Sequence, residues 1–83
     1  MKVTILMSTY NGERFLAEQI ESIRQQTYTD WRLLIRDDGS KDRTREIIQD
    51  FCQKDNRIHF VNPDSVENLG VIKSFFYLLK YQE

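Results

Sequence analysis

The sequence lacks several features that would assign a protein class at once. Only one of its 83 residues is a cysteine, Cys52, so an internal disulfide is excluded, which fits a reducing compartment. Charges nearly balance, with 12 lysines and arginines against 13 aspartates and glutamates. This balance indicates neither a nucleic-acid footprint nor a polybasic membrane patch. The apolar runs 3–7 and 75–79 are too short for a signal-peptide core or a membrane span.

Common catalytic and phosphate-binding motifs are missing as well. No glycine-rich phosphate loop of either standard pattern occurs, and residues 37–42 lack the spacing of a calcium loop. The single histidine, His59, alternates with apolar residues and is typical of a surface strand position. Cys52 falls on a predicted helix, where a small apolar filler is favoured over a nucleophile.

The sequence does contain a regular alternation of strand and helix patterns. Apolar and β-branched runs predict strands over residues 2–8, 31–36 and 57–61. Apolar residues at helical spacing predict helices over 13–26, 41–54 and 71–81. This βαβαβα order predicts an α/β fold with a three-layer, Rossmann-like parallel sheet, because crossover connections are right-handed. The near-continuous apolar run of the first strand predicts burial on both of its faces.

Two polar segments follow the first two predicted strands. Ser8 to Gly12 (STYNG) follows the first strand, and Asp37 to Ser40 (DDGS) follows the second. The carboxyl ends of parallel strands share one edge of the sheet, where open α/β folds bind their ligands. We therefore expect one pocket with an aromatic face, hydroxyls and a carboxylate. That combination suits a nucleoside better than a metal ion or a proton-transfer site.

Asp38 and Tyr10 are the central candidates for contacts to a base. Uracil and thymine carry an N3–H donor that cytosine and the purines lack, and the charged Asp38 carboxylate can accept it strongly. Tyr10 can stack on the base, an interaction worth roughly 1–3 kcal/mol in single-strand binders. Ser8 and Thr9 add hydroxyl groups. The alternatives are a DDGS segment that only caps a helix and a tyrosine that only packs over the sheet edge.

Lys73 is the candidate for a diphosphate contact. It falls in the first turn of the last predicted helix, so a diphosphate could meet both the lysine and the helix N-terminus. The alternative is an ordinary solvated lysine.

These segments together resemble a known family. Residues 3–12 (VTILMSTYNG), 25–28 (QQTY), 34–42 (LIRDDGSKD) and 68–71 (NLGV) resemble the opening half of family 2 glycosyltransferases, and most of all its bacterial rhamnosyltransferase-like members. The resemblance covers essentially the whole chain. It implies that residues 1–83 are the N-terminal, nucleotide-binding part of a truncated glycosyltransferase domain.

The resemblance implies an inverting transferase of the GT-A fold. Its donor would be a UDP- or dTDP-sugar and its acceptor a saccharide or a lipid-linked saccharide, with no nucleic acid involved. The positions matching Ser8, Tyr10 and Asp38 line the nucleoside pocket in that family. Asp37 is expected to support the turn and is a candidate contact to the base or the ribose. Lys73 is expected to approach the diphosphate.

The resemblance also implies what the chain leaves out. It ends before the Asp-x-Asp motif that holds Mg²⁺ or Mn²⁺ and before the general base of the family. We therefore expect no catalytic residue and no cofactor in this chain, a Mg or Mn ion in the full-length enzyme, and no turnover from these residues alone. The expected location is cytoplasmic, with the inner face of the membrane as the alternative for the full-length protein.

Truncation would leave apolar surface uncovered. The first strand would become an open sheet edge. The last predicted helix carries two lines of apolar residues, Val71, Phe75 and Leu78 on one and Ile72, Phe76 and Leu79 on the other. Together they form an apolar stripe wider than a three-stranded sheet can cover. We expect self-association through the strand edge or through this helix face.

Two other functions remain as alternatives. One is a non-catalytic α/β interaction module, such as a receiver-like domain, although receiver acids follow the first strand and here the acid pair follows the second. The other is a structural remnant without ligand affinity.

Overall fold

The chain alternates strands and helices in the predicted order. The structure, a computed structural model, describes residues 2–64 and 67–81, apart from the side chains at positions 71 and 75. Its elements are β1 (Val3–Thr9), α1 (Leu16–Arg24), β2 (Trp31–Asp37), α2 (Thr44–Lys54), β3 (Ile58–Phe60) and α3 (Val71–Tyr81). The bounds of α3 match those predicted, whereas α1 and α2 begin later than their sequence patterns indicate.

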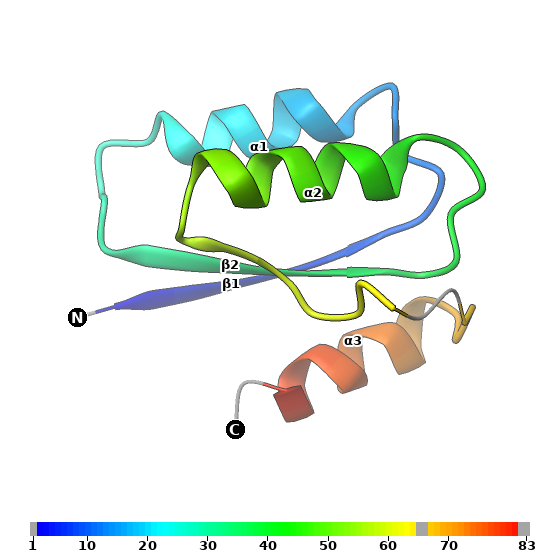
Figure 1. The fold of residues 1–83 in the computed structure, drawn as a ribbon. Coiled ribbons are helices and arrows are strands. Elements are labelled where there is room, and N and C mark those ends of the chain that lie inside the picture. Colours follow the sequence, from blue (N-terminus) through cyan, green and yellow to red (C-terminus); the bar gives the residue numbers. More distant parts are fainter. Residues whose placement is uncertain (1, 65–66, 82–83) are drawn as a thin grey trace.

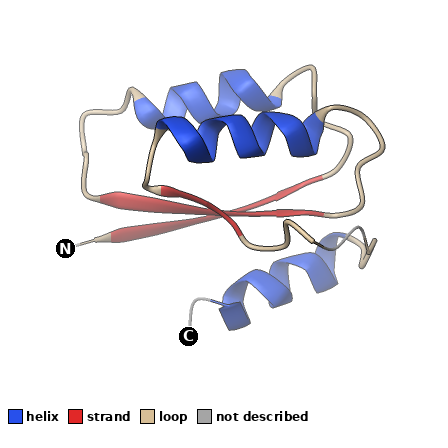
Figure 2. Ribbon diagram, in the orientation of Figure 1, coloured by secondary structure: helices blue, strands red, loops and turns tan. Residues whose placement is uncertain are grey.

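The three strands form one parallel sheet in the order β1-β2-β3. The central strand β2 pairs with β1 along its whole length, from Trp31 opposite Val3 to Asp37 opposite Thr9. Helices α1 and α2 lie on one face of the sheet and α3 lies on the other (Figures 1 and 2). This three-layer arrangement confirms the predicted α/β, Rossmann-like fold class.

The side chains of β2 alternate between two apolar clusters, because successive residues of a strand point to opposite faces. The larger cluster lies beneath α1 and α2, and its buried members are Leu16, Ile20, Trp31, Leu33, Ile35, Ile48, Phe51 and Ile58. The smaller cluster joins β2 to α3, and its buried members are Leu34, Val61 and Leu78, with Leu6 packed against them. Apart from the half-buried Arg32, all residues of β2 are buried, which fixes the position of its carboxyl end.

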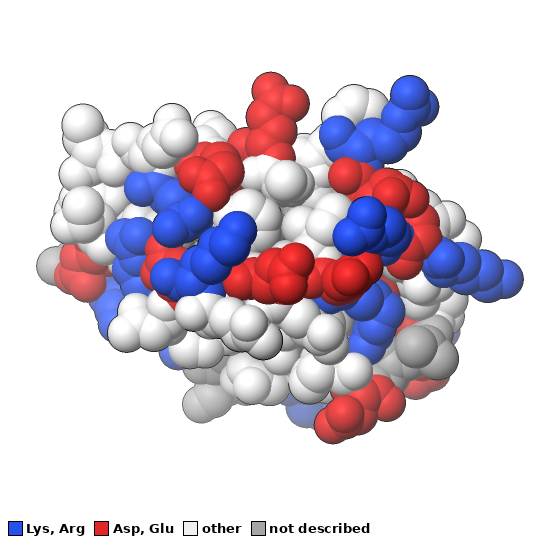
Figure 3. All heavy atoms as spheres, turned by 45° about the horizontal axis from the view of Figure 1, so that its top comes forward, with Lys and Arg blue, Asp and Glu red and all other residues white. Residues whose placement is uncertain are grey.

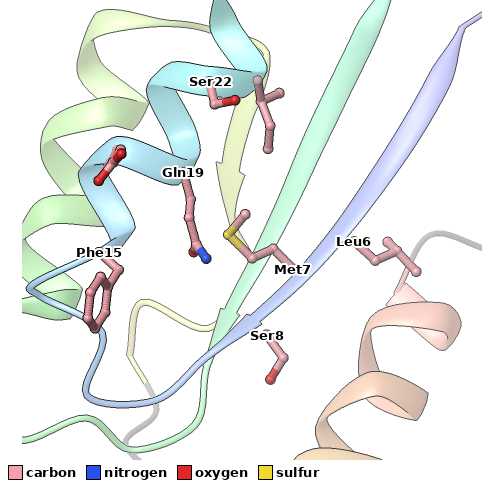
Figure 4. A pocket seen from close by; sticks show the side chains of 8 residues that line it. Leu6, Met7, Ser8, Phe15, Gln19 and Ser22 are labelled. Atoms are coloured by element: carbon pink, nitrogen blue, oxygen red, sulfur yellow. The ribbon is translucent and has the colours of Figure 1, made fainter.

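The edge strand β1 departs from expectation. Most of its residues are partly or largely exposed rather than buried on both faces, because the described residues pair it with β2 alone. A groove of about 790 Å³ lies between β1 and α1. Met7 and Gln19 point into this groove, while Leu6 points toward α3 (Figure 4). One edge of β1 and the adjoining groove therefore remain uncovered.

The surface carries charges of both signs. Basic and acidic side chains intermingle over the face turned toward the viewer in Figure 3, and neither sign forms a region of its own there. In the described part of the chain, none of the helices has the length and apolar character needed to cross a membrane.

Candidate functional site

The carboxyl ends of β1 and β2 lie side by side. Thr9 and Asp37 are partners in the parallel register, and Thr9 Oγ1 donates a 3.1 Å hydrogen bond to Asp37 Oδ1. The next backbone N–H, that of Asp38, donates to the Thr9 carbonyl at 2.8 Å. The two polar segments that the sequence singles out therefore meet at one edge of the sheet.

The loop after β1 is fastened to the loop after β2. The backbone N–H of Asn11 donates to Ser40 Oγ at 2.7 Å, and the N–H of Lys41 donates to Asn11 Oδ1 at 2.9 Å. Asn11 has a left-handed backbone with φ 48°, and Gly39 makes the opposing turn with φ 80°. Asparagine and glycine are the residues that tolerate this conformation best. The paired loops hold Tyr10 in place between β1 and Asn11.

Asp37 is fully buried, and four hydrogen bonds saturate its carboxylate. Oδ1 accepts from the hydroxyls of Thr9 and Ser40. Oδ2 accepts from the Ser40 backbone N–H at 2.9 Å and from Arg45 Nη1 at 3.1 Å. A carboxylate has about four acceptor positions, so a ligand would have to displace one of these donors. In this structure Asp37 holds the turn together.

Asp38 is 5% exposed and faces the segment that leads into α3. Its Oδ1 accepts from Arg36 Nη1 at 2.8 Å and from the Leu69 N–H at 2.6 Å. Its Oδ2 accepts from the Gly70 N–H at 3.0 Å. Three of about four acceptor positions are thus filled by donors among the described residues. Among the described residues, one acceptor position on Oδ2 therefore remains without a donor.

The Asp38 carboxyl group is held in its ionised form. Burial raises its pKa, but the hydrogen bonds from Leu69, Arg36 and Gly70, together with the Arg36 charge, outweigh that effect and leave the pKa below its usual value. At neutral pH the group is therefore only an acceptor.

Tyr10 and Ser8 border the same edge, but their surroundings differ. Tyr10 is 54% exposed, so much of its side chain is accessible to a ligand. Ser8 Oγ lies 2.7 Å from Ser74 Oγ of α3. Thr9 is buried, and its hydroxyl group is hydrogen-bonded to Asp37, so it stabilises the loop rather than facing solvent. A small pocket of about 210 Å³ adjoins these residues and is lined by Ser8, Thr9, Tyr10, Gly12, Phe15, Leu16 and Gln19.

Lys73 lies in the first turn of α3, at the end of the helix that approaches Asp38 through Gly70. Its side chain is exposed, and no hydrogen bond or ion pair ties it to another residue within 2–64 and 67–81. The ammonium group is thus available to an anionic ligand.

Sequence reasoning missed Arg36 and Ser74. Arg36 is 2% exposed and binds both Asp38 and Ser74, which is itself fully buried. The available signal was an arginine that follows three apolar residues of the strand and directly precedes two acids. Among the described residues, no cluster of three or more histidine, cysteine, aspartate or glutamate side chains is placed to hold a metal ion.

The structure is an α/β protein whose polar segments meet at the carboxyl ends of parallel strands, the edge where open α/β folds bind their ligands. The profile described as Glycosyl transferase family 2 matches residues 4–81. The chain therefore belongs to glycosyltransferase family 2.

Individual relatives agree with this assignment. The chain is 43% identical over 56 residues, 68% of its length, to UDP-Glc:alpha-D-GlcNAc-diphosphoundecaprenol beta-1,3-glucosyltransferase WfgD of Escherichia coli. It is 40% identical over 70 residues, 82% of its length, to an uncharacterized glycosyltransferase of Methanocaldococcus jannaschii. It is 34% identical over 70 residues, 84% of its length, to glycosyltransferase GlyA of Streptococcus pneumoniae. These matches span 21%, 23% and 10% of the respective relatives.

Proposed function

We propose that this chain forms the nucleoside-binding part of a glycosyltransferase that uses a UDP- or dTDP-sugar and inverts the anomeric carbon. The observation that carries the proposal is the junction of the β1 and β2 ends. There an exposed Tyr10 and the ionised Asp38 carboxylate directly follow adjacent strands, and Asp38 keeps one acceptor position among the described residues. The name of WfgD includes UDP-Glc, which supports a uridine nucleotide as the donor.

We propose a separate role for each of the site residues. Asp38 accepts the N3–H of the base, Tyr10 stacks on it, and Ser8 lines the pocket beside them. Lys73 approaches the diphosphate. Thr9 and Asp37 shape the turn and do not contact the ligand, because their side chains already bind each other.

We propose a saccharide or a lipid-linked saccharide as the acceptor, in polysaccharide biosynthesis. The diphosphoundecaprenol in the name of WfgD supports a lipid-linked acceptor, and another relative is named for teichuronic acid biosynthesis. Such an acceptor also favours a cytoplasmic protein working at the inner face of the membrane. Family membership leaves the receiver-like alternative without support.

The chemistry itself is proposed to need residues beyond this chain. A Mg or Mn ion on the diphosphate and a general base at the acceptor hydroxyl would both be held by other parts of a longer protein. The small share of each relative's length that the chain spans supports this division. The 83 residues alone are then expected to bind the nucleotide without turnover.

We also propose that a second copy of the chain pairs with the free edge of β1. The bonds from Val3 N to Asp30 O and from Asp38 N to Thr9 O turn the odd-numbered residues of β1 toward β2. Strand alternation then directs the N–H and C=O groups of Thr4, Leu6 and Ser8 to the open edge. Such unpaired edges readily template a further strand.

Nucleotide titration tests the binding proposal. UDP and dTDP should each cause saturable changes of the Tyr10 and Asp38 amide resonances, while CDP, whose base lacks the N3–H, should bind at least about tenfold more weakly. Asp38→Asn should lose the preference for UDP, whereas Asp64→Asn, which neutralises an exposed acid, should keep it. Equal affinities for UDP and CDP, or equal UDP binding by Asp38→Asn, would remove the proposed role of this carboxylate.

A further inference from the structure

Arg36 joins the candidate site to α3. Its Nη1 donates to Asp38 Oδ1 at 2.8 Å and to Ser74 Oγ at 3.0 Å. Its Nη2 donates to the backbone carbonyl of Glu67 at 3.1 Å, and its guanidinium carbon lies 5.1 Å from the centre of the Tyr77 ring. One buried side chain thus contacts the site carboxylate, the segment before α3, and α3 itself.

Stability alone gives a poor account of this arginine. Its Nε atom is buried without a hydrogen-bond partner among the described residues, an arrangement that costs free energy. Arg36 lies on the face of β2 that also carries the buried Leu34, where a hydrocarbon side chain would pack without that cost. Buried ion pairs are often no more stable than apolar replacements of similar volume.

The position of Arg36 also ties the two strand ends to each other through α3. Ser74, which accepts from Arg36, lies 2.7 Å from the Ser8 hydroxyl at the end of β1. The carboxylate of Asp38 and the hydroxyl of Ser8 are therefore connected through two side chains, Arg36 and Ser74. Movement of Arg36 would displace both edges of the proposed pocket.

We infer that Arg36 is a positioning residue for nucleoside binding, which holds Asp38 Oδ1 against the start of α3 so that Oδ2 keeps its remaining acceptor position for the ligand. This inference rests on the proposed function and adds to it a residue that contacts no ligand itself. Arg36 acts on Asp38 in two ways: it fixes the orientation of the carboxylate, and its charge favours the ionised form.

The experiment compares three arginine variants of the 83-residue chain. Arg36→Met removes the charge and all donors, Arg36→Lys keeps the charge, and Arg32→Met removes an arginine from the same strand whose bond goes to Thr4, away from the site. For each folded variant, the Asp38 carboxyl carbon resonance is followed against pH, and UDP affinity is measured at pH 7. The first readout needs no ligand.

Arg36→Met should raise the titration midpoint of Asp38 by more than about one pH unit. Burial raises the pKa of this carboxyl group, and the variant lacks the arginine hydrogen bond and charge that oppose this effect. UDP affinity should fall about tenfold, because a misoriented Asp38 carboxylate would lose its charged hydrogen bond to the base. Arg36→Lys should recover part of both effects, and Arg32→Met should change neither. If Arg36→Met does not fold, Arg36→Lys and Ser74→Ala are used in its place. Each should raise the Asp38 titration midpoint and lower UDP affinity by a smaller amount.

An unchanged Asp38 titration and unchanged UDP affinity in a folded Arg36 variant would overturn the inference. A loss of stability with normal UDP affinity would also overturn it, since Arg36 would then be structural only. If the unmodified chain binds neither UDP nor dTDP, the proposed function fails, and the Asp38 titration still decides whether Arg36 governs this carboxylate.

Discussion

Asp37 and Asp38 are adjacent in the chain, yet their carboxylates bind different arginines from different sides of the sheet. Asp37 Oδ2 accepts from Arg45 of α2 at 3.1 Å, whereas Asp38 Oδ1 accepts from Arg36 at 2.8 Å beside α3. Strand alternation explains the divergence, because neighbouring side chains leave β2 toward opposite faces. The described residues supply four donors to the Asp37 carboxylate and three to that of Asp38, so the two acids are expected to respond differently to substitution.

Asp37→Asn should destabilise the chain. The substitution keeps the size of a fully buried side chain but removes the charge that faces Arg45 and one of the acceptor oxygens. The free energy of unfolding in urea should fall by about 3 kcal/mol. Glu46→Gln, which breaks the exposed pair with Arg43, is the control and should cost no more than about 0.5 kcal/mol. Equal losses in the two variants would contradict a structural role for Asp37.

Tyr10→Ala should weaken nucleotide binding without weakening the fold. The ring is 54% exposed, so little packing is lost, while a stacking partner worth roughly 1–3 kcal/mol is removed. UDP affinity measured by calorimetry should fall by about tenfold. Tyr10→Phe should bind like the unmodified chain. Tyr81→Ala, which truncates a tyrosine of similar exposure at the far end of α3, should leave UDP affinity unchanged.

Acid should destabilise the chain through Asp55. Hydrogen bonds from the Arg57 side chain hold the pKa of Asp55 far below its usual value although burial opposes them, and a bond from Arg24 lowers it further. Because the folded-state pKa is depressed, this stabilisation is complete above the unfolded-state value of about 3.9 and is lost as the pH falls below it. Urea denaturation between about pH 6 and pH 2 should show a loss on the order of 2 kcal/mol that Asp55→Asn lacks.

The remaining acid sensitivity in Asp55→Asn should come partly from Asp38 and Asp42, whose pKa values are also lowered. A pH profile of the Asp55→Asn variant that matches the unmodified chain would show that Asp55 has no such role.

Thr4→Pro should reduce self-association. Proline removes an N–H donor, and its place on the free edge of β1 leaves the pairing with β2 intact. Thr4→Ala is the matched control, since it loses the hydroxyl that Arg32 binds but keeps the N–H. Sedimentation over a range of concentrations should show dimers in the unmodified chain and in Thr4→Ala, and mainly monomers in Thr4→Pro.

A different outcome would point to α3 as the interface. Ile72 and Phe76 are 72% and 63% exposed on that helix, as the sequence pattern predicts for part of its apolar surface, whereas Leu78 is fully buried. If Phe76→Ser dissociates the dimer and Thr4→Pro does not, the helix face is the contact. A chain that stays monomeric at all concentrations would refute both surfaces.

The elements of the fold were predictable because their patterns are local. The apolar spacing of residues 71–81 is long and regular enough to give α3 its observed bounds. The start of α1 was predicted too early: the helix begins at Leu16, and Phe15, which precedes it, is 64% exposed. The exposure of β1 was not predictable from its composition, because an apolar run does not show how many neighbouring strands a strand has.

The meeting of the strand ends followed from chain topology, but the roles of the two acids did not. Which carboxylate keeps an acceptor position depends on backbone donors at Leu69 and Gly70, which are distant from Asp38 in sequence. The same distance hid Arg36, whose partner Ser74 lies on a helix that sequence patterns place only approximately against the sheet. Side-chain direction and long-range pairing therefore set the limit of what the sequence alone could indicate.

Because Leu69, Gly70 and Ser74 come from the last third of the chain, the surroundings of Asp38 are completed only after that part has been synthesised. A chain that ended before residue 69 would leave Asp38 without the amide donors of Leu69 and Gly70. The surroundings of Asp38 are in this sense complete only when α3 docks on the sheet.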